Sequence, residues 1–340
     1  MLYTVIIYIL CTLAIKTHLG GTIMSKRKYT LLKIGFSLTF LTVVLHIINK
    51  LVSASAVFKN LLNTKSGDYY KWRFGDVFYK KQGSGSPLLL IHHLSPSSSS
   101  EEWKSVIKEL SQKHTVYAID LLGCGRSAKP NLTYTNFLYV QLATDFVENV
   151  IGQKTDVIAS GLSGSFVVMA CANNEETFNK VMLINPEDIN TLNQIPSKAS
   201  KFVKNLLDLP LIGTLVYNIL TSKSNIELLF TEKYLYNPFS VAQSTIDTYY
   251  EAAHTSAGKG KYLLSSIIGK YIYFNISHGL KSINNSLFIV TGADSTNADE
   301  TIALYTLLNP AFESETIPKT KLLPQQEAPE QLLELIRTFF

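Results

Sequence analysis

Residues 156–172 read DVIASGLSGSFVVMACA and join a short apolar run to a helical pattern through a turn rich in glycine and serine. The run Asp156–Ala159 has the length and content of a buried strand, and Ser163–Ala172 has those of a helix packed on a sheet. Gly164 is small enough to let that helix approach the sheet closely. The stretch therefore predicts a strand–turn–helix unit of an α/β domain.

The same alternation continues on both sides of this unit. We expect strands at 69–74, 77–80, 88–92, 115–119, 156–159, 180–185, 287–291 and 315–317. We expect helices at 103–110, 137–151, 163–172, 299–308 and 330–340. The first two strands should form a hairpin around Gly75-Asp76. Continuous apolar strands separated by helices indicate an α/β fold with a mostly parallel sheet flanked by helices.

A long segment of mostly helical character, residues 189–285, interrupts the alternation. Ligands of parallel sheets bind beyond the carboxyl ends of the strands, and an insertion at this point is expected to cover that edge. The predicted organisation is an N-terminal region over 1–67, an α/β core over 68–188 and 286–340, and a helical cap over 189–285.

The N-terminal 67 residues differ in charge from the rest of the chain. They contain eight basic residues and no acidic one, which leaves 23 basic against 26 acidic residues for the remainder. The net charge of +5 therefore comes from the N-terminal region. A basic segment on a near-neutral body indicates a membrane lipid bilayer as partner, and it argues against nucleic acid.

Two apolar stretches lie in this region. Leu2–Ile15 is short, whereas residues 29–48 approach the roughly 20 residues that cross a bilayer. Residues 53–56 are only a weak cleavage signal. We expect an uncleaved, single-pass anchor in the cell membrane, with Lys26–Lys33 cytoplasmic and the main domain extracytoplasmic. A hairpin of both stretches, an amphipathic surface segment and a start at Met24 are the alternatives.

The sequence predicts neither a metal nor a cofactor. The three cysteines, Cys11, Cys124 and Cys171, have no metal-ligand spacing and are interpreted as small buried hydrophobic residues. The glycine-rich turns at 83–86 and 123–125 do not open a helix directly, as a phosphate-binding loop would. Both turns are therefore interpreted as structural.

The order of motifs resembles that of the α/β-hydrolase superfamily from about Tyr69 to Phe340. The run Leu88–His92 resembles the strand before the oxyanion loop, and residues 120–127, DLLGCGRS, are similar to the D-x-x-G-x-G-x-S turn. Residues 324–330 resemble the segment after the catalytic histidine, and the helical insertion matches the cap domain in position. The resemblance implies a serine on a sharp strand-to-helix elbow, a histidine base, an orienting carboxylate and backbone donors for an oxyanion.

Two registers are open at the elbow. In the first, Gly161 holds the nucleophile position and Gly164 allows the close helix–sheet approach. In the second, Ser163 is the nucleophile, which puts Phe166 where a small residue is wanted and makes the strand two residues longer. We prefer the first register, in which the nucleophilic hydroxyl is absent.

The family places its histidine base after the last long strand. The seven histidines of the chain end at His278, and the matching position, two before Pro324, holds Leu322. A leucine neither accepts nor donates a proton, so the ordinary base is missing in either register. Only a relocated base, His93 or His254, could activate Ser163.

The orienting carboxylate is ambiguous. The family position about three residues past Gly292 is Ser295, with Asp294 beside it. Glu187 and Asp188, after the preceding strand, are an alternative location. A solvated loop carboxylate is the simpler interpretation of each. Asp294 is the candidate acid of the hydrolase hypothesis.

The predicted oxyanion loop and elbow supply candidate binding residues. His92 matches the family's structural histidine, and His93 stands where a glycine is common, so that its ring can project into the cleft. The expected binding residues are His92, His93, Leu94, Gly161, Leu162 and Leu322.

Three functions remain open at this point. The preferred one is a degenerate hydrolase that binds a small apolar or acyl ligand, or a partner, without the standard triad. The second is an active hydrolase of ester-like substrates that uses Ser163 with His93 or His254. The third is catalysis without a covalent serine intermediate. The fold does not decide among them, because it hosts many chemistries.

Overall fold

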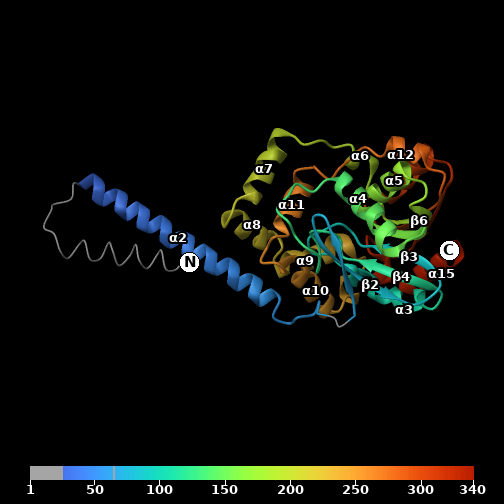
Figure 1. Cartoon of the computed structure of the whole chain (residues 1–340), viewed down its shortest axis with the longest axis horizontal. Helices are drawn as coiled ribbons and strands as arrows, with labels where there is room; N and C mark the ends of the chain where they lie inside the picture. The colour runs from blue at the N-terminus through green and yellow to red at the C-terminus, as the bar shows by residue number, and fades with distance from the viewer. Residues whose placement is uncertain (1–25, 64–65) are drawn as a thin grey trace. The chain divides into compact units, whose positions relative to one another are not determined.

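The computed structural model describes residues 26–63 and 66–340, which divide into two compact units at His46/Ile47 (Figure 1). Helix α2 (Lys26–Ala56) provides the described part of the first unit, and its residues from Ile47 onward belong to the second. The predicted stretch Leu2–Ile15 and Met24 lie outside the described residues.

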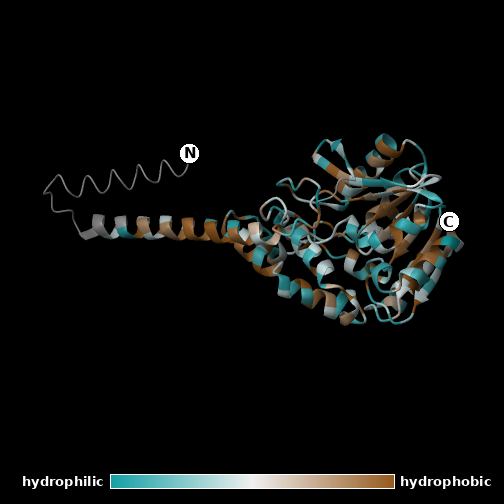
Figure 2. Ribbon diagram, turned by 90° about the horizontal axis from the view of Figure 1, so that it is seen from below, coloured by the Kyte–Doolittle hydropathy of each residue, from teal (hydrophilic) through white to brown (hydrophobic). Residues whose placement is uncertain are grey.

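Most exposed side chains of α2 are apolar, and Figure 2 shows hydrophobic residues along much of the helix. Its residues Lys33–Ala56 are long and apolar enough to cross a membrane, and a signal sequence near an N-terminus has the same properties. Length and composition therefore make α2 a candidate membrane span.

The second unit is built on an eight-stranded sheet of order β1-β2-β4-β3-β5-β6-β7-β8. Its strands are β1 (Asp68–Trp72), β2 (Gly75–Gln82), β3 (Ser86–Ile91), β4 (His114–Ile119), β5 (Thr155–Ser160), β6 (Phe178–Ile184), β7 (Ser286–Gly292) and β8 (Phe312–Ile317). The pairs β1–β2 and β2–β4 are antiparallel, and all others are parallel. The predicted mostly parallel sheet is confirmed.

The predicted hairpin forms, but its turn lies two residues earlier than expected. Trp72 pairs with Gly75, so the turn is Arg73-Phe74, and Gly75-Asp76 already belong to β2. The prediction placed the turn at Gly75 because glycine is common in turns. In the structure Gly75 instead begins the strand, where it adopts a φ of 137°.

Side-chain alternation along the strands builds two apolar layers. In β3, Leu89 and Ile91 join one core cluster, whereas Leu88 and Leu90 join the other. The first layer is covered by α4 (Asn136–Phe146), η2 (Val147–Ile151), α5 (Ser163–Asn173) and α13 (Ala298–Leu308). The second is covered by η1 (Ser100–Trp103), α3 (Lys104–Leu110) and α15 (Pro329–Phe339), and the short α14 (Pro324–Glu327) precedes α15. Helices therefore flank both faces, as predicted.

Between β6 and β7 the chain forms a helical insertion. Its helices are α6 (Ile189–Leu192), α7 (Lys198–Asp208), α8 (Ile212–Leu220), α9 (Lys223–Leu229), η3 (Phe230–Tyr234), η4 (Pro238–Ser240), α10 (Gln243–His254), α11 (Lys261–Ile268) and α12 (Ser277–Ser282). Part of it makes a third apolar cluster, in which Phe230, Tyr234 and Tyr249 pack with Leu323 of the core. The insertion thus meets the sheet at the edge where its parallel strands end.

Candidate functional site

The turn between β5 and α5 is formed at Gly161. Its φ is 57°, in the left-handed region that favours glycine. The Gly161 N–H donates to the Ile184 carbonyl at 2.8 Å, and the Gly161 carbonyl accepts from Gly164 N–H at 3.1 Å. This is the sharp strand-to-helix geometry that presents a nucleophile in α/β hydrolases. Glycine carries no side chain, so the turn residue itself presents no functional group.

The ring of His93 fills the space beside this turn. A Cβ on Gly161 would overlap His93 Nδ1 and lie 3.0 Å from Cε1. The ring also meets Tyr234 edge-on, with ring centroids 6.2 Å apart. Burial, with additional effects of His92 and Lys233, lowers the pKa of His93 to about 4. The imidazole is therefore neutral near pH 7, and its shielded Nδ1 has no hydrogen-bond partner among the described residues.

A buried carboxyl group lies behind the loop that follows β3. Both oxygens of Glu102 accept from the His93 N–H, at 3.1 and 3.2 Å, and Oε1 accepts from Gln325 Nε2 at 2.7 Å. Gln325 also donates to Ser160 Oγ at 3.3 Å. Burial raises the pKa of Glu102 to about 7 against these hydrogen bonds. One backbone donor of the loop, the His93 N–H, is therefore engaged and is not free to hold an oxyanion.

Ser163 is the first residue of α5 and is buried. Its hydroxyl donates to the His92 carbonyl at 2.6 Å. The His92 ring accepts the Leu121 N–H at Nε2, 3.0 Å away, which leaves Nδ1 to donate to the His93 carbonyl at 2.8 Å. Among the described residues, the Ser163 hydroxyl has no hydrogen bond to an imidazole.

The other proposed base, His254, ends α10. Its Nδ1 lies 2.9 Å from the Tyr250 carbonyl, and its ring packs against that of Tyr250 with centroids 4.5 Å apart. Burial lowers the pKa of His254. The structure does not bring this ring into hydrogen-bond contact with Ser163.

Leu322 lies in the segment between β8 and α14. Asn185, at the end of β6, donates to the carbonyls of Lys321 and Leu322 at 2.9 and 3.1 Å, and its Oδ1 accepts the Gly292 N–H at 3.0 Å. Leu322 is partly buried against the apolar cluster of the insertion. Asn185 thereby links the ends of β6 and β7 to the segment that holds Leu322, and the side chain at 322 contributes only apolar contact.

The candidate carboxylates are in separate places. Asp294 is exposed, and its N–H donates to the Thr320 carbonyl at 3.0 Å. Asp188 caps α6 by accepting the Thr191 N–H at 3.1 Å. Burial, with the charge of Asp188, raises the pKa of Glu187. None of these three makes a hydrogen bond to a histidine among the described residues.

Leu94 and Leu162 are buried in the larger apolar core cluster. Together with His93 and the aromatic rings of the insertion, they make the packing at the carboxyl edge largely apolar. In the described ranges 26–63 and 66–340, no cluster of three metal-ligating side chains occurs. Cys124 and Cys171 are buried free thiols, and Cys11 lies outside the described residues. The described contacts at this edge are apolar packing together with the hydrogen bonds of Glu102, Gln325 and Asn185.

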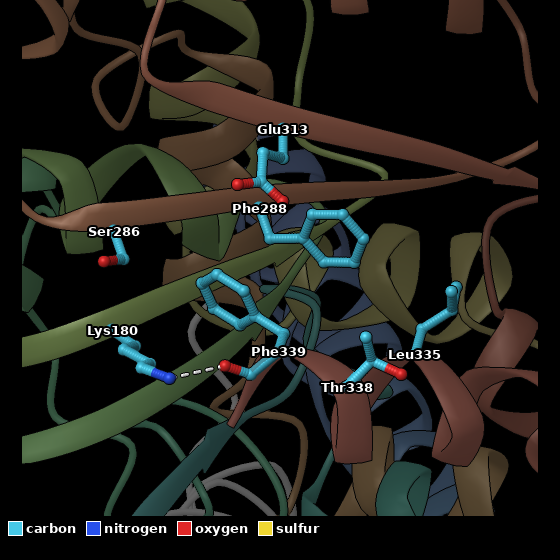
Figure 3. Close-up of a pocket in the computed structure, with 7 residues that line it drawn as sticks. All are labelled: Lys180, Ser286, Phe288, Glu313, Leu335, Thr338 and Phe339. Atoms are coloured by element: carbon cyan, nitrogen blue, oxygen red, sulfur yellow. Dashed lines mark hydrogen bonds between the residues drawn. The ribbon is translucent and has the colours of Figure 1, made fainter.

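A cavity of about 290 Å³ lies at the opposite edge of the sheet, where β6, β7 and β8 begin (Figure 3). It is lined by Lys180, Ser286, Phe288, Glu313, Leu335, Thr338 and Phe339. Lys180 Nζ donates to the Phe339 carbonyl at 2.6 Å, and the rings of Phe288 and Phe339 stack. Parallel sheets bind ligands at the carboxyl edge, so this cavity is outside the candidate site.

Comparison with known proteins identifies the family. The sequence profile of the alpha/beta hydrolase family matches residues 88–335. The chain is 29% identical over 130 residues to a 2-hydroxy-6-oxo-6-(2'-aminophenyl)hexa-2,4-dienoic acid hydrolase of Metapseudomonas resinovorans, covering 36% of this chain and 45% of that protein. It is 34% identical over 111 residues to a soluble epoxide hydrolase of Corynebacterium sp. (strain C12), covering 32% and 37%. The matches therefore span less than half of these relatives.

Solved structures agree on the fold. The crystal structure of a serine hydrolase involved in carbazole degradation has a TM-score of 0.66 at 19% identity and covers 80% of this chain and 97% of its own. A membrane phospholipase A, a bacterial virulence factor, has a TM-score of 0.64 at 18% identity and covers 92% and 97%. The chain belongs to the alpha/beta hydrolase family.

Three residues of the site were not found by sequence reasoning. Gln325 lies in the segment that resembled the region after the family's histidine, so the sequence pointed to this segment but not to Gln325 itself. Glu102 and Tyr234 carried no signal, because an acid in a helical stretch and a tyrosine in an insertion are ordinary. Glu102 and Tyr234 contact His93, and Gln325 bonds to Glu102; Tyr234 and Gln325 lie far from His93 in sequence.

Proposed function

We propose that this chain is a membrane-tethered alpha/beta hydrolase-fold protein that lacks the serine–histidine mechanism and serves as a binding protein for a small apolar or acyl ligand, or for a partner. The observation that carries the proposal is the elbow itself. Gly161 supplies the turn without a hydroxyl, and the His93 ring takes the space that a side chain there would need.

The surrounding groups support a non-catalytic role. Serine becomes a nucleophile when a base accepts its proton. The only serine proposed for that role, Ser163, donates to a backbone carbonyl instead. Leu322 provides no base, and the low pKa of His93 makes its ring a weak proton acceptor. The apolar lining formed by Leu94, Leu162 and the insertion suits an apolar or acyl group.

The tether is supported by how the chain continues after the apolar helix. Ser53 and Ala56 of the weak cleavage signal are buried, and the backbone N–H groups of Leu61 and Leu62 donate to the Glu251 carboxylate at 2.7 and 3.0 Å. An uncleaved helix keeps Ser53 and Ala56 in their buried places, whereas cleavage at 53–56 would break the chain at these buried residues, just before the segment that Glu251 holds. The likeness to the membrane phospholipase A also extends over 92% of the chain.

We further propose a single-pass anchor in the cell membrane, with the helical insertion acting as a cap and the main domain extracytoplasmic. The basic residues before the apolar stretch favour a cytoplasmic N-terminal side. Protease protection of a C-terminal tag in intact cells tests the orientation. We expect an added protease to remove the tag from intact cells. If the tag is lost only after permeabilisation, the main domain is cytoplasmic and the proposed orientation is wrong.

Fluorophosphonate labelling of the full-length protein tests the absence of a catalytic serine. We expect no labelling of the wild type under conditions in which a serine hydrolase in the same preparation reacts. Labelling that disappears in Ser163→Ala, but persists in the matched variant Ser165→Ala, would refute the proposal. It would establish the alternative, an active hydrolase that uses Ser163 with His93 or His254.

A further inference from the structure

Helix α7 buries two polar side chains and exposes most of its large apolar ones. Its buried positions are Ser200, Lys204 and Leu207. The exposed large apolar side chains are Phe202, Val203 and Leu206 on the helix and Leu209 directly after it, and Phe202 is 70% exposed. The spacing of three and four residues puts these four on one face. Surface helices in water show the opposite arrangement, with the apolar stripe against the core.

Polar bonds fix this orientation. Lys204 Nζ pairs with Asp208 Oδ2 at 2.6 Å, and Asp208 Oδ1 accepts from Ser265 Oγ at 2.6 Å. Ser200 donates to the Gly269 carbonyl at 3.3 Å. Rotating α7 to hide Phe202 would break these bonds and strand a lysine and an aspartate in apolar surroundings. The outward apolar face is therefore a stable property of the insertion.

The next helix continues the pattern. In α8, Tyr217 and Asn218 are buried, whereas Ile212 and Ile219 are 49% and 58% exposed. No charged residue occurs in residues 209–222. The pair α7–α8 is bent by 104° and meets the length and hydropathy of a membrane-embedded pair. Figure 1 shows both helices on the side of the insertion that faces away from the sheet.

This apolar surface adjoins the end of α2 that belongs to the same compact unit. Asn49 Nδ2 donates to the Leu211 carbonyl in the α7–α8 turn at 3.0 Å, and Asn218 Nδ2 donates to Asn49 Oδ1 at 2.9 Å. Beside Asn49, Ile48 and Leu51 are 39% and 64% exposed. Within the second unit, the outward face of α7 and α8 thus adjoins the exposed apolar residues at the C-terminal end of α2.

The charges around the surface match anionic headgroups. Residues 189–223 contain four lysines and a single acid, Asp208, which is paired with Lys204. Lys198 and Lys201 are exposed on α7, and Lys50 is exposed on α2. Lysine stems can lie along acyl chains while their ammonium groups reach lipid phosphates.

We propose that α7 and α8 lie in the interface of the bilayer that α2 crosses, with Phe202, Leu206, Ile212 and Ile219 among the acyl chains of anionic lipids. This inference rests on the proposed membrane tether. It adds that the cap itself is a lipid-binding surface, which would bring the carboxyl edge of the sheet close to the membrane.

Site-directed fluorescence in nanodiscs tests it with the full-length chain. The discs contain phosphatidylcholine and phosphatidylglycerol in equal parts, with or without nitroxide-labelled lipid. A Cys11→Ser background leaves Cys124 and Cys171, both buried. Into it we introduce Phe202→Cys or the matched control Leu307→Cys, which is 77% exposed on α13, and attach an environment-sensitive dye. We expect blue-shifted emission and several-fold stronger nitroxide quenching at 202 than at 307.

Equal quenching at 202 and 307 would overturn the inference. So would a blue-shifted label at 202 that lipid nitroxides do not quench, because a protein partner would then cover the surface.

Phe40→Cys in α2 separates the two proposals. If the label at 40 is quenched and the label at 202 is not, the proposed lipid contact of the cap is wrong and the membrane tether stands. If the label at 40 is not quenched, the membrane tether is wrong as well. Omitting phosphatidylglycerol, or introducing Lys198→Gln and Lys201→Gln together, should weaken quenching at 202, and no change would contradict the role of anionic lipid.

Discussion

The interior of the sheet and its carboxyl edge differ in what their residues do. Inside the sheet, Leu88 to Ile91 alternate between two apolar layers, as the fold requires. At the carboxyl edge, Gly161 makes a sharp strand-to-helix turn with a positive φ, and the His93 ring occupies the space beside it. Stability and chemistry are therefore carried by different residues, and the side chains of the carboxyl edge can change while the sheet is unaffected. Four variants test this separation.

The largest effect is expected in the sheet. Ile158 is fully buried in β5, and Ile158→Ala should lower the free energy of unfolding by about 2–5 kcal/mol, because it removes apolar contact and leaves a cavity. Urea denaturation in detergent micelles measures the change. A loss below about 1 kcal/mol would show that the sheet interior is not the main source of stability.

Glu102 should make stability depend on pH. Its pKa is raised from 4.5 to about 7, so the folded state binds more protons than the unfolded state between these values. The free energy of unfolding then falls as pH rises through this window, by about 3 kcal/mol at most. Relative to wild type, Glu102→Gln should gain stability from pH 5 to pH 8.

His93 acts with the opposite sign. Its pKa is lowered to about 4, so the folded state binds fewer protons than the unfolded state between pH 4 and 6.5, and stability increases as pH rises there. The two effects partly cancel in the wild type, and comparing urea midpoints of wild type and Glu102→Gln at each pH isolates Glu102. A constant difference between the two proteins across pH 5–8 would contradict its assigned protonation.

Gly161→Ser tests the closure of the elbow. The matched control Gly152→Ser has a φ of 77° with no neighbouring atom within 4 Å of a new Cβ, whereas at 161 the Cβ meets His93. Both substitutions put a side chain on a backbone in the left-handed region, which destabilises each variant. At 161, overpacking against His93 should add about 1–3 kcal/mol of destabilisation. Thermal unfolding of both variants, and of Gly161→Ser with His93→Gly, measures it. Equal losses at 161 and 152 would mean that His93 moves aside freely.

The smallest effect is expected at Asp294. Its side chain is exposed and makes no hydrogen bond to a histidine among the described residues. Asp294→Asn should change the free energy of unfolding by less than about 0.5 kcal/mol and leave its pH dependence unaltered. A larger effect in the same denaturation assay would reveal an electrostatic role at the carboxyl edge.

Much of the fold was predictable because local patterns agree with the tertiary structure. The strand at 156–159 was observed at Thr155–Ser160, and the helix at 163–172 at Ser163–Asn173. The hairpin turn was misplaced, because a Gly-Asp pair is a common turn signal and here it begins a strand. The short strand predicted at 315–317 extends over Phe312–Ile317, since its exposed Glu313 and Ser314 hide the apolar pattern.

By itself, the sequence determined the alternating α/β order and the apolar N-terminal helix, and its resemblance to the family predicted Gly161 and Leu322 at the nucleophile and base positions. Periodicity and residue identity are local, so they can be read along the chain. Only the tertiary structure decided that the His93 ring lies at Gly161, that Glu102 and Gln325 meet behind it, and that α7 faces outward with its apolar side. These features depend on contacts between residues far apart in sequence, whose positions are fixed only when the sheet and the insertion pack together.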